Sequence, residues 1–145
     1  MGRSHATTLI EGGSSVRTRI ALPAALLLML TTSAGPGSAH HVKADFVSIG
    51  GSGVTGFVQL TQLPHGGTNI HVIARGLQPG STYASFYYES GECSAPADLL
   101  QSFTANASGT GQADGKIDDD LDEVGSVSVR VGPDYGTLLA CATVH

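Results

Sequence analysis

The sequence predicts an all-β fold, a sandwich of seven or eight short antiparallel strands. Three observations favour this class. After residue 40, short apolar stretches recur about every ten residues, several of them alternate apolar with polar side chains, and clusters of Gly, Pro and Asn separate them. No stretch in this region has helical periodicity. This spacing of strands and turns is typical of a β-sandwich.

The expected strands, in chain order, are Asp45–Ile49, Val54–Gln62, Thr68–Arg75, Thr82–Glu89, Gln101–Ala107, Gly111–Ile117, Ser126–Val131 and Thr137–Val144. Alternation is clear in the third strand, where alternate residues from Ile70 to Ala74 point to one face. In the seventh strand, Val127, Val129 and Val131 are expected to form the buried face. We find no internal repeat and no linker that would divide this region.

Residues 1–39 have the features of a signal peptide for export. Arg17 and Arg19 supply positive charge, an eleven-residue apolar run follows over residues 20–30, and small residues at 37–39 suit a signal peptidase. The apolar run is shorter than the roughly 20 residues that span a bilayer. We therefore expect a secreted or periplasmic protein with no membrane span in the mature chain.

Two alternatives concern this leader. Its polar beginning is long, which suggests that translation starts at Val16. The apolar run also allows a buried helix of the mature domain, but Pro23 and the small residues that follow the run fit a helix poorly. The export reading is therefore preferred.

The mature chain, residues 40–145, is long enough for one domain with a modest core. It has four basic and eleven acidic residues, a net charge of −7, which argues against nucleic acid or an anionic membrane as partner. The acidic run Asp118–Glu123 is expected to be a solvated loop. A calcium loop is the alternative, but the EF-hand pattern needs Gly at its sixth position, where Glu123 stands.

The two cysteines, Cys93 and Cys141, are expected to form a disulfide, because an exported protein meets an oxidising compartment. The alternative is a pair of thiolate metal ligands. That reading lacks close spacing and neighbouring histidines.

Several motifs occur in the order of a known family. They are Gly76-Leu77-Gln78-Pro79-Gly80, then Cys93, then Phe103 to Gly111, and finally Leu139-Ala140-Cys141. This order resembles Cu/Zn superoxide dismutase, and still more the compact exported domains related to it and to chordin-type (CHRD) domains. The resemblance covers residues 44–144 and implies a Greek-key β-sandwich whose two cysteines tie a loop to the last strand.

The family's catalytic residues do not carry over. The resemblance places the His-x-His copper ligands on Phe86 and Tyr88. The short segment Ser94–Ser102, where zinc ligands would lie, has no histidine, and neither does the strand 126–131. Leu138 stands where the family has an arginine that guides the superoxide anion. We therefore expect no bound cofactor and no dismutase activity through the family's site, since redox catalysis there needs imidazole ligands.

Aromatic residues gather near the replaced positions. Alternation along the strand places Phe86 and Tyr88 on one face and Tyr83 and Tyr87 on the other; Tyr135 lies further along the chain. Core or interface packing is the preferred reading. A tyrosine-lined ligand pocket, or an exposed aromatic patch for a protein or glycan, is the alternative.

One feature offers a metal site outside the family's pattern. Cleavage after Ala39 would give a mature chain that begins His40-His41, and a terminal amine with imidazole can chelate Cu(II). A third ligand would come from His41, His65, His71 or His145. The alternative, which we prefer, is that processing occurs elsewhere or that these histidines belong to a disordered tail.

Three functions remain at this stage. The first is a secreted, non-catalytic sandwich with a binding or structural role in the cell envelope. The second is a copper-binding module that uses His40 and His41, and the third is a superoxide dismutase with a rebuilt site. The first is preferred, with an unidentified protein or small-molecule partner.

Overall fold

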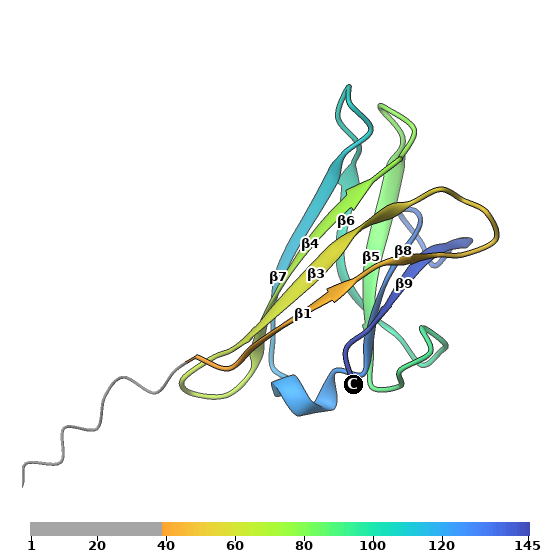
Figure 1. Ribbon diagram of the computed structural model, residues 1–145. Coiled ribbons are helices and arrows are strands. Elements are labelled where there is room, and N and C mark those ends of the chain that lie inside the picture. The colour runs from red at the N-terminus through yellow and green to blue at the C-terminus, as the bar shows by residue number, and fades with distance from the viewer. Residues whose placement is uncertain (1–38) are drawn as a thin grey trace, which may run out of the picture. The chain divides into compact units, whose positions relative to one another are not determined.

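The computed structural model describes residues 39–145, so the predicted signal peptide lies outside the described residues. The elements are β1 His41–Asp45, β2 Val47–Ser48, β3 Thr55–Gln62, β4 Thr68–Arg75, β5 Thr82–Tyr88, β6 Asp98–Thr104, β7 Gly111–Ile117, the 3-10 helix η1 Leu121–Glu123, β8 Ser126–Val131 and β9 Leu138–Thr143. The predicted all-β class is confirmed (Figure 1).

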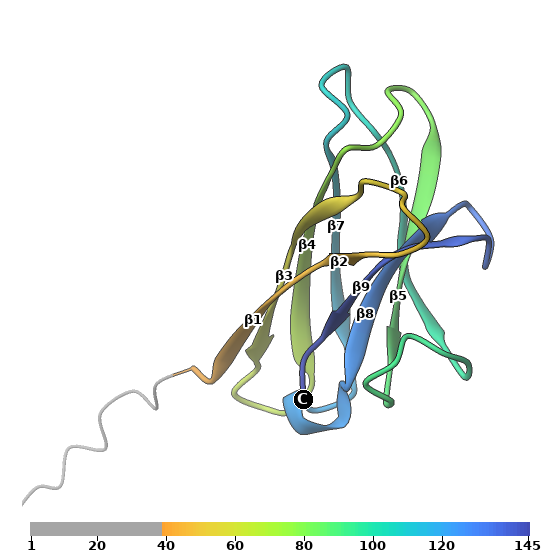
Figure 2. The ribbon, with the colours of Figure 1, turned by 45° about the vertical axis from the view of Figure 1, so that its right-hand side comes forward.

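The strands form two antiparallel sheets. One has the order β1-β3-β4-β7 and the other the order β2-β9-β8-β5-β6. β1 and β2 follow one another directly, so the chain passes from the first sheet to the second at Phe46 (Figure 2). Phe46 is buried, and its backbone N–H donates to the carbonyl of Gly56 at 2.9 Å.

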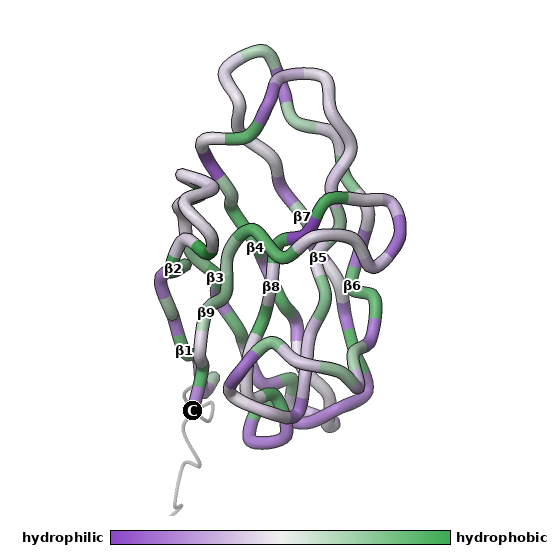
Figure 3. Tube along the Cα trace, turned by 90° about the vertical axis from the view of Figure 1, so that its right-hand side faces the viewer, coloured by the Kyte–Doolittle hydropathy of each residue, from purple (hydrophilic) through white to green (hydrophobic). Residues whose placement is uncertain are grey.

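The core lies between the two sheets and follows from the alternation in the strands. On β4, Ile70, Val72 and Ala74 are fully buried, as predicted, and Val127 and Val129 of β8 meet them from the other sheet. Burying each such aliphatic side chain contributes about 1.5–3 kcal/mol. Figure 3 shows the resulting alternation of apolar and polar segments along the strands.

The prediction for Val131 is wrong. Its side chain is 44% exposed, because the register between β8 and β9 shifts after Val129 and the strand then runs past the end of the core. The first predicted strand is also different, since β1 begins at His41 and the strand breaks at Phe46. The strand expected over Gln101–Ala107 is β6, which lies three residues earlier.

Side chains join β6 and β7, which are the edge strands of different sheets. A Cβ at Gly115 of β7 would lie 2.3 Å from Cδ1 of Leu100, so only glycine lets this leucine pack against β7. Beside it, the carbonyl oxygen of the Gln101 side chain accepts from the backbone N–H of Asp114 at 2.7 Å. These contacts bring the two sheets together along this side.

The acidic run Asp118–Glu123 is largely exposed, yet two of its carboxylates have structural partners. Asp120 accepts from the backbone N–H of Gly67 and from the side chain of Gln62, both at 2.8 Å, and these bonds lower the pKa of its carboxyl. Glu123 accepts from the backbone N–H of Asp120 at 2.8 Å. The run therefore fastens η1 to the turn between β3 and β4.

Candidate functional site

A second buried cluster lies on the outer face of the five-stranded sheet, separate from the core. Phe86 and Tyr88 of β5 belong to it, whereas Tyr83 and Tyr87 pack on the core side. This arrangement confirms the predicted alternation. Tyr88 is 1% exposed, and its hydroxyl lies 2.8 Å from the hydroxyl of Ser128 on the neighbouring strand β8.

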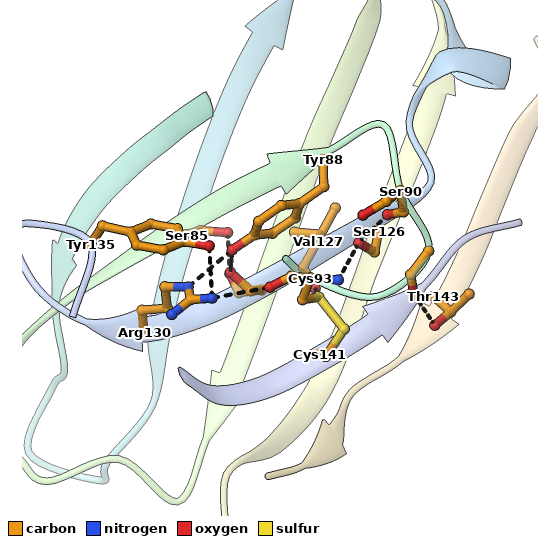
Figure 4. The surroundings of a disulfide bond; sticks show 12 residues. Ser85, Tyr88, Ser90, Cys93, Ser126, Val127, Arg130, Tyr135, Cys141 and Thr143 are labelled. Atoms are coloured by element: carbon orange, nitrogen blue, oxygen red, sulfur yellow. Dashed lines mark hydrogen bonds between the residues drawn. A yellow bond between two sulfur atoms is a disulfide. The ribbon is translucent and has the colours of Figure 1, made fainter. Parts of the chain in front are cut away.

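The predicted disulfide between Cys93 and Cys141 is present, with the two Cα atoms 6.0 Å apart. It fastens the loop between β5 and β6 to β9, over the outer cluster (Figure 4). Cys93 has a left-handed backbone with φ of 53°, a conformation that costs a non-glycine residue about 1–2 kcal/mol. Its N–H donates to the Ser126 hydroxyl at 3.0 Å, which helps to hold this conformation.

Arg130 is the centre of the cluster and was not selected from the sequence. It is 8% exposed, and its guanidinium donates to four oxygens from three segments of the chain. Nε donates to the Tyr88 hydroxyl at 3.0 Å and Nη1 to the carbonyl of Gly136 at 2.9 Å. Nη2 donates to the carbonyl of Cys93 at 3.0 Å and to the Tyr135 hydroxyl at 2.9 Å (Figure 4).

Tyr135 lies between this guanidinium and the solvent. The Arg130 Cζ is 3.8 Å from the centre of the Tyr135 ring, a cation–π contact, and the ring meets Phe86 edge-on with centroids 4.9 Å apart. Tyr135 itself is 42% exposed. Burial and the neighbouring Tyr88 raise the pKa of the Tyr135 phenol despite the opposing effect of Arg130, so the phenol is neutral at neutral pH.

Arg130 therefore has no anionic partner within residues 39–145. The one ion pair among these residues joins His71 to Asp114 on the other sheet. The remaining lysines and arginines of this region, Lys43, Arg75 and Lys116, also belong to the four-stranded sheet. Arg130 is thus the only such cation in the five-stranded sheet.

The alternation in β8 tells which way Arg130 faces, but only the structure shows that it is buried. The residues of β8 that alternate with the buried valines are Ser126, Ser128 and Arg130, so the arginine faces away from the core. All three are nevertheless buried. Because these polar side chains are buried although they face away from the core, another part of the chain must cover this face of the sheet.

Exposed apolar side chains also gather on this half of the molecule. Among residues 39–145, the large hydrophobic side chains that remain exposed are Val47, Ile49, Leu99, Val131 and Tyr135. All five come from the five-stranded sheet or from the loops that adjoin its strands. Leu99 is 54% exposed and pairs across the strands with Phe86, which places it beside the outer cluster.

The predicted histidine candidates lie in different places. His40 and His145 line one cleft of about 310 Å³, whose other walls are Val42, Gln62, Leu121 and Asp122. The Nε2 of His145 is 3.0 Å from the carbonyl oxygen of Leu121. His41 lies with Nδ1 3.0 Å from the carbonyl oxygen of Ala39, and His65 is exposed in a turn.

Within the part of the chain that the structure describes, no three His, Cys, Asp or Glu side chains lie close enough to share a metal ion. Over the same residues, no helix is sufficiently long and apolar to cross a membrane. No protein-family model matches the chain, and no curated protein is similar enough to count as a match.

Proposed function

We propose that this protein is an exported, non-catalytic β-sandwich of the superoxide dismutase-like type that acts by binding a partner in the cell envelope. The outer face of the five-stranded sheet is the binding surface. The observation that carries this proposal is the gathering of exposed apolar side chains on this sheet and its loops, next to a buried arginine that has no anionic partner among residues 39–145.

The strand arrangement supports the Greek-key part of the proposal. Followed backwards along the chain, β7 lies beside β6 across the edges of the two sheets, β6 pairs antiparallel with β5, and β4 returns to pair antiparallel with β7. This succession is compatible with the Greek key that we propose. The disulfide from the loop after β5 to the last strand also agrees with what the family resemblance implies.

The absence of dismutase activity is supported by what occupies the family's metal positions. Phe86 and Tyr88 are buried in the outer cluster, and neither offers an imidazole. The guanidinium of Arg130 is hydrogen-bonded to Tyr88, so a fixed positive charge lies beside the position where copper would sit. Like charges at such short range repel strongly in a buried site.

Elemental analysis of the exported protein, purified with its natural N-terminus and no histidine tag, tests this proposal. We expect neither copper nor zinc in stoichiometric amount, and no superoxide removal above that of a metal-free control protein. Stoichiometric metal together with metal-dependent superoxide removal would contradict it.

The second candidate function is a copper-binding module, and the cleft shared by His40 and His145 favours it. Cleavage after Ala39 would add the terminal amine of His40, which with two imidazoles gives three nitrogen donors for Cu(II). A Cu(II) titration of the chain that starts at His40 tests this function. It predicts a loss of affinity in His145→Ala and on acetylation of the terminal amine, and an unchanged affinity in His65→Ala.

A further inference from the structure

The hydrogen-bond acceptors around the guanidinium of Arg130 form two groups. On one side, Nε and Nη2 are held by the Tyr88 hydroxyl and the Cys93 carbonyl, groups fixed by the sheet and by the disulfide. On the other side, Nη1 and Nη2 are held by the Gly136 carbonyl and the Tyr135 hydroxyl. These last two oxygens come from the loop between β8 and β9, residues 132–137.

This loop supplies one oxygen acceptor to each of Nη1 and Nη2, two nitrogens through which arginine can bind both oxygens of a carboxylate. A carboxylate binds arginine most strongly through two parallel hydrogen bonds from one edge of the guanidinium. Here two neutral oxygens occupy that Nη1–Nη2 edge, at 2.9 Å each. The loop thus holds the arginine in place without neutralising it.

The charge of Arg130 remains uncompensated although acids are near in the sequence. Glu92, Asp98 and Asp134 belong to the loops and the strand end around the cluster, but all three are exposed and none lies within 4.0 Å of the guanidinium nitrogens. A buried charge is normally paired, because removing it from water is costly. A buried arginine without a carboxylate partner can bind an anion from outside the chain.

We propose that the Nη1–Nη2 edge of Arg130 receives the side-chain carboxylate of a glutamate or aspartate from a protein partner, in place of the Tyr135 hydroxyl and the Gly136 carbonyl. This inference rests on the proposed binding function and names the chemistry of the partner. The partner's segment carries its acidic residue between apolar residues, which pack on Leu99 and on the ring of Tyr135.

The surroundings favour a protein segment over a small free anion. Leu99 and Tyr135 are each exposed by more than two fifths; the Tyr135 ring contacts both Arg130 and Phe86, and Phe86 is the cross-strand neighbour of Leu99. Arginine and tyrosine are the side chains that most often dominate protein interfaces, especially when apolar neighbours exclude water around them. A hydrated small anion would gain nothing from these apolar groups.

The test is an NMR titration of the oxidised, exported protein with two matched peptides, acetyl-Leu-Glu-Phe-amide and acetyl-Leu-Gln-Phe-amide. We expect the glutamate peptide to shift the Arg130 Nε–H and Tyr135 ring signals, and to bind at least tenfold more tightly than the glutamine peptide.

Tyr135→Phe removes one competing oxygen and should tighten glutamate-peptide binding several-fold. Arg130→Lys keeps the charge but loses the paired donors and should weaken it at least tenfold, whereas Arg75→Lys on the other sheet should have no effect.

Three results would overturn the inference. These are equal binding of the two peptides, no binding of either, or shifts centred away from Arg130 and Tyr135. Should Arg130→Lys fail to fold, Tyr135→Phe decides, because weaker or unchanged binding by that variant contradicts the displacement of its hydroxyl. Partner binding that depends on Leu99 but shows no preference for glutamate would overturn this inference alone and leave the proposed function intact.

Discussion

The outer faces of the two sheets differ in how their polar groups are satisfied. On the four-stranded sheet, Lys43 lies 4.2 Å from the ring centre of Phe57, and Asp114 receives hydrogen bonds from Gln112 and His71. Lys43 and Asp114 thus have partners near the solvent. On the five-stranded sheet, Arg130 is buried among neutral oxygens under two loops, with exposed apolar side chains around it. The second face therefore differs from the first in having, among residues 39–145, a buried arginine without an anionic partner together with exposed apolar side chains.

The largest expected effect comes from removing the disulfide that covers the second face. Cys93→Ala/Cys141→Ala should lower the free energy of unfolding by about 2–5 kcal/mol, because the crosslink restricts the unfolded chain over a separation of 48 residues. Urea unfolding measures this change. Relative to the unaltered protein, the double variant should show a larger increase in the hydrogen-exchange rate of the loop 89–97 than of β4. Uniform acceleration in both sheets would contradict a local role for the disulfide at the outer cluster.

A smaller effect is expected within the cluster itself. Tyr88→Phe leaves the Arg130 Nε and the Ser128 hydroxyl without their buried partner, and should cost about 1–3 kcal/mol of unfolding free energy. Tyr135→Phe is the matched control, since this residue is 42% exposed and Arg130 keeps three other oxygen acceptors, and should cost under about 1 kcal/mol. Equal costs in urea unfolding would show that the buried network is not the source of stability.

The smallest effect is expected on the four-stranded face and depends on pH. Burial tends to raise the pKa of the Asp114 carboxyl, but hydrogen bonds from His71 and Gln112 outweigh it and lower the pKa. The folded state therefore holds this proton less tightly than the unfolded state. The stabilisation is present above the unfolded pKa of about 3.9 and is lost as pH falls through the folded pKa.

Asp114→Asn should accordingly lower stability by less than about 1 kcal/mol at pH 7, because the pair is exposed, and should flatten the loss of stability below about pH 4. Thermal unfolding between pH 2 and 7 measures both effects. A steeper acid dependence in Asp114→Asn than in the unaltered protein would contradict the assigned sign.

The fold was largely predictable because alternation is local. Each strand of the core, such as β4, carries its own period-two pattern, and the turns between strands are rich in glycine. β6 was misplaced because it is an edge strand with most positions exposed, so hydrophobicity does not mark its ends. Val131 was misassigned because a register shift cannot be read from a pattern of alternating valines.

The candidate site was predictable only in part. The disulfide and the side of β5 that carries Phe86 and Tyr88 follow from the sequence. The network around Arg130 does not, because its partners lie at three separate places in the chain and meet only when two loops close over the sheet. Long-range contacts between neutral oxygens and one arginine leave no local periodicity.

Binding of the purified protein to isolated cell envelopes of the producing organism, compared for two matched variants, tests the proposed binding face most directly. Leu99→Ser removes an exposed leucine beside the outer cluster, and Ile73→Ser removes a half-buried isoleucine from the outer face of the other sheet. We predict that Leu99→Ser weakens binding at least tenfold and that Ile73→Ser leaves it unchanged. No binding by the unaltered protein, an equal loss in both variants, or a loss confined to Ile73→Ser would contradict a binding role for the five-stranded face.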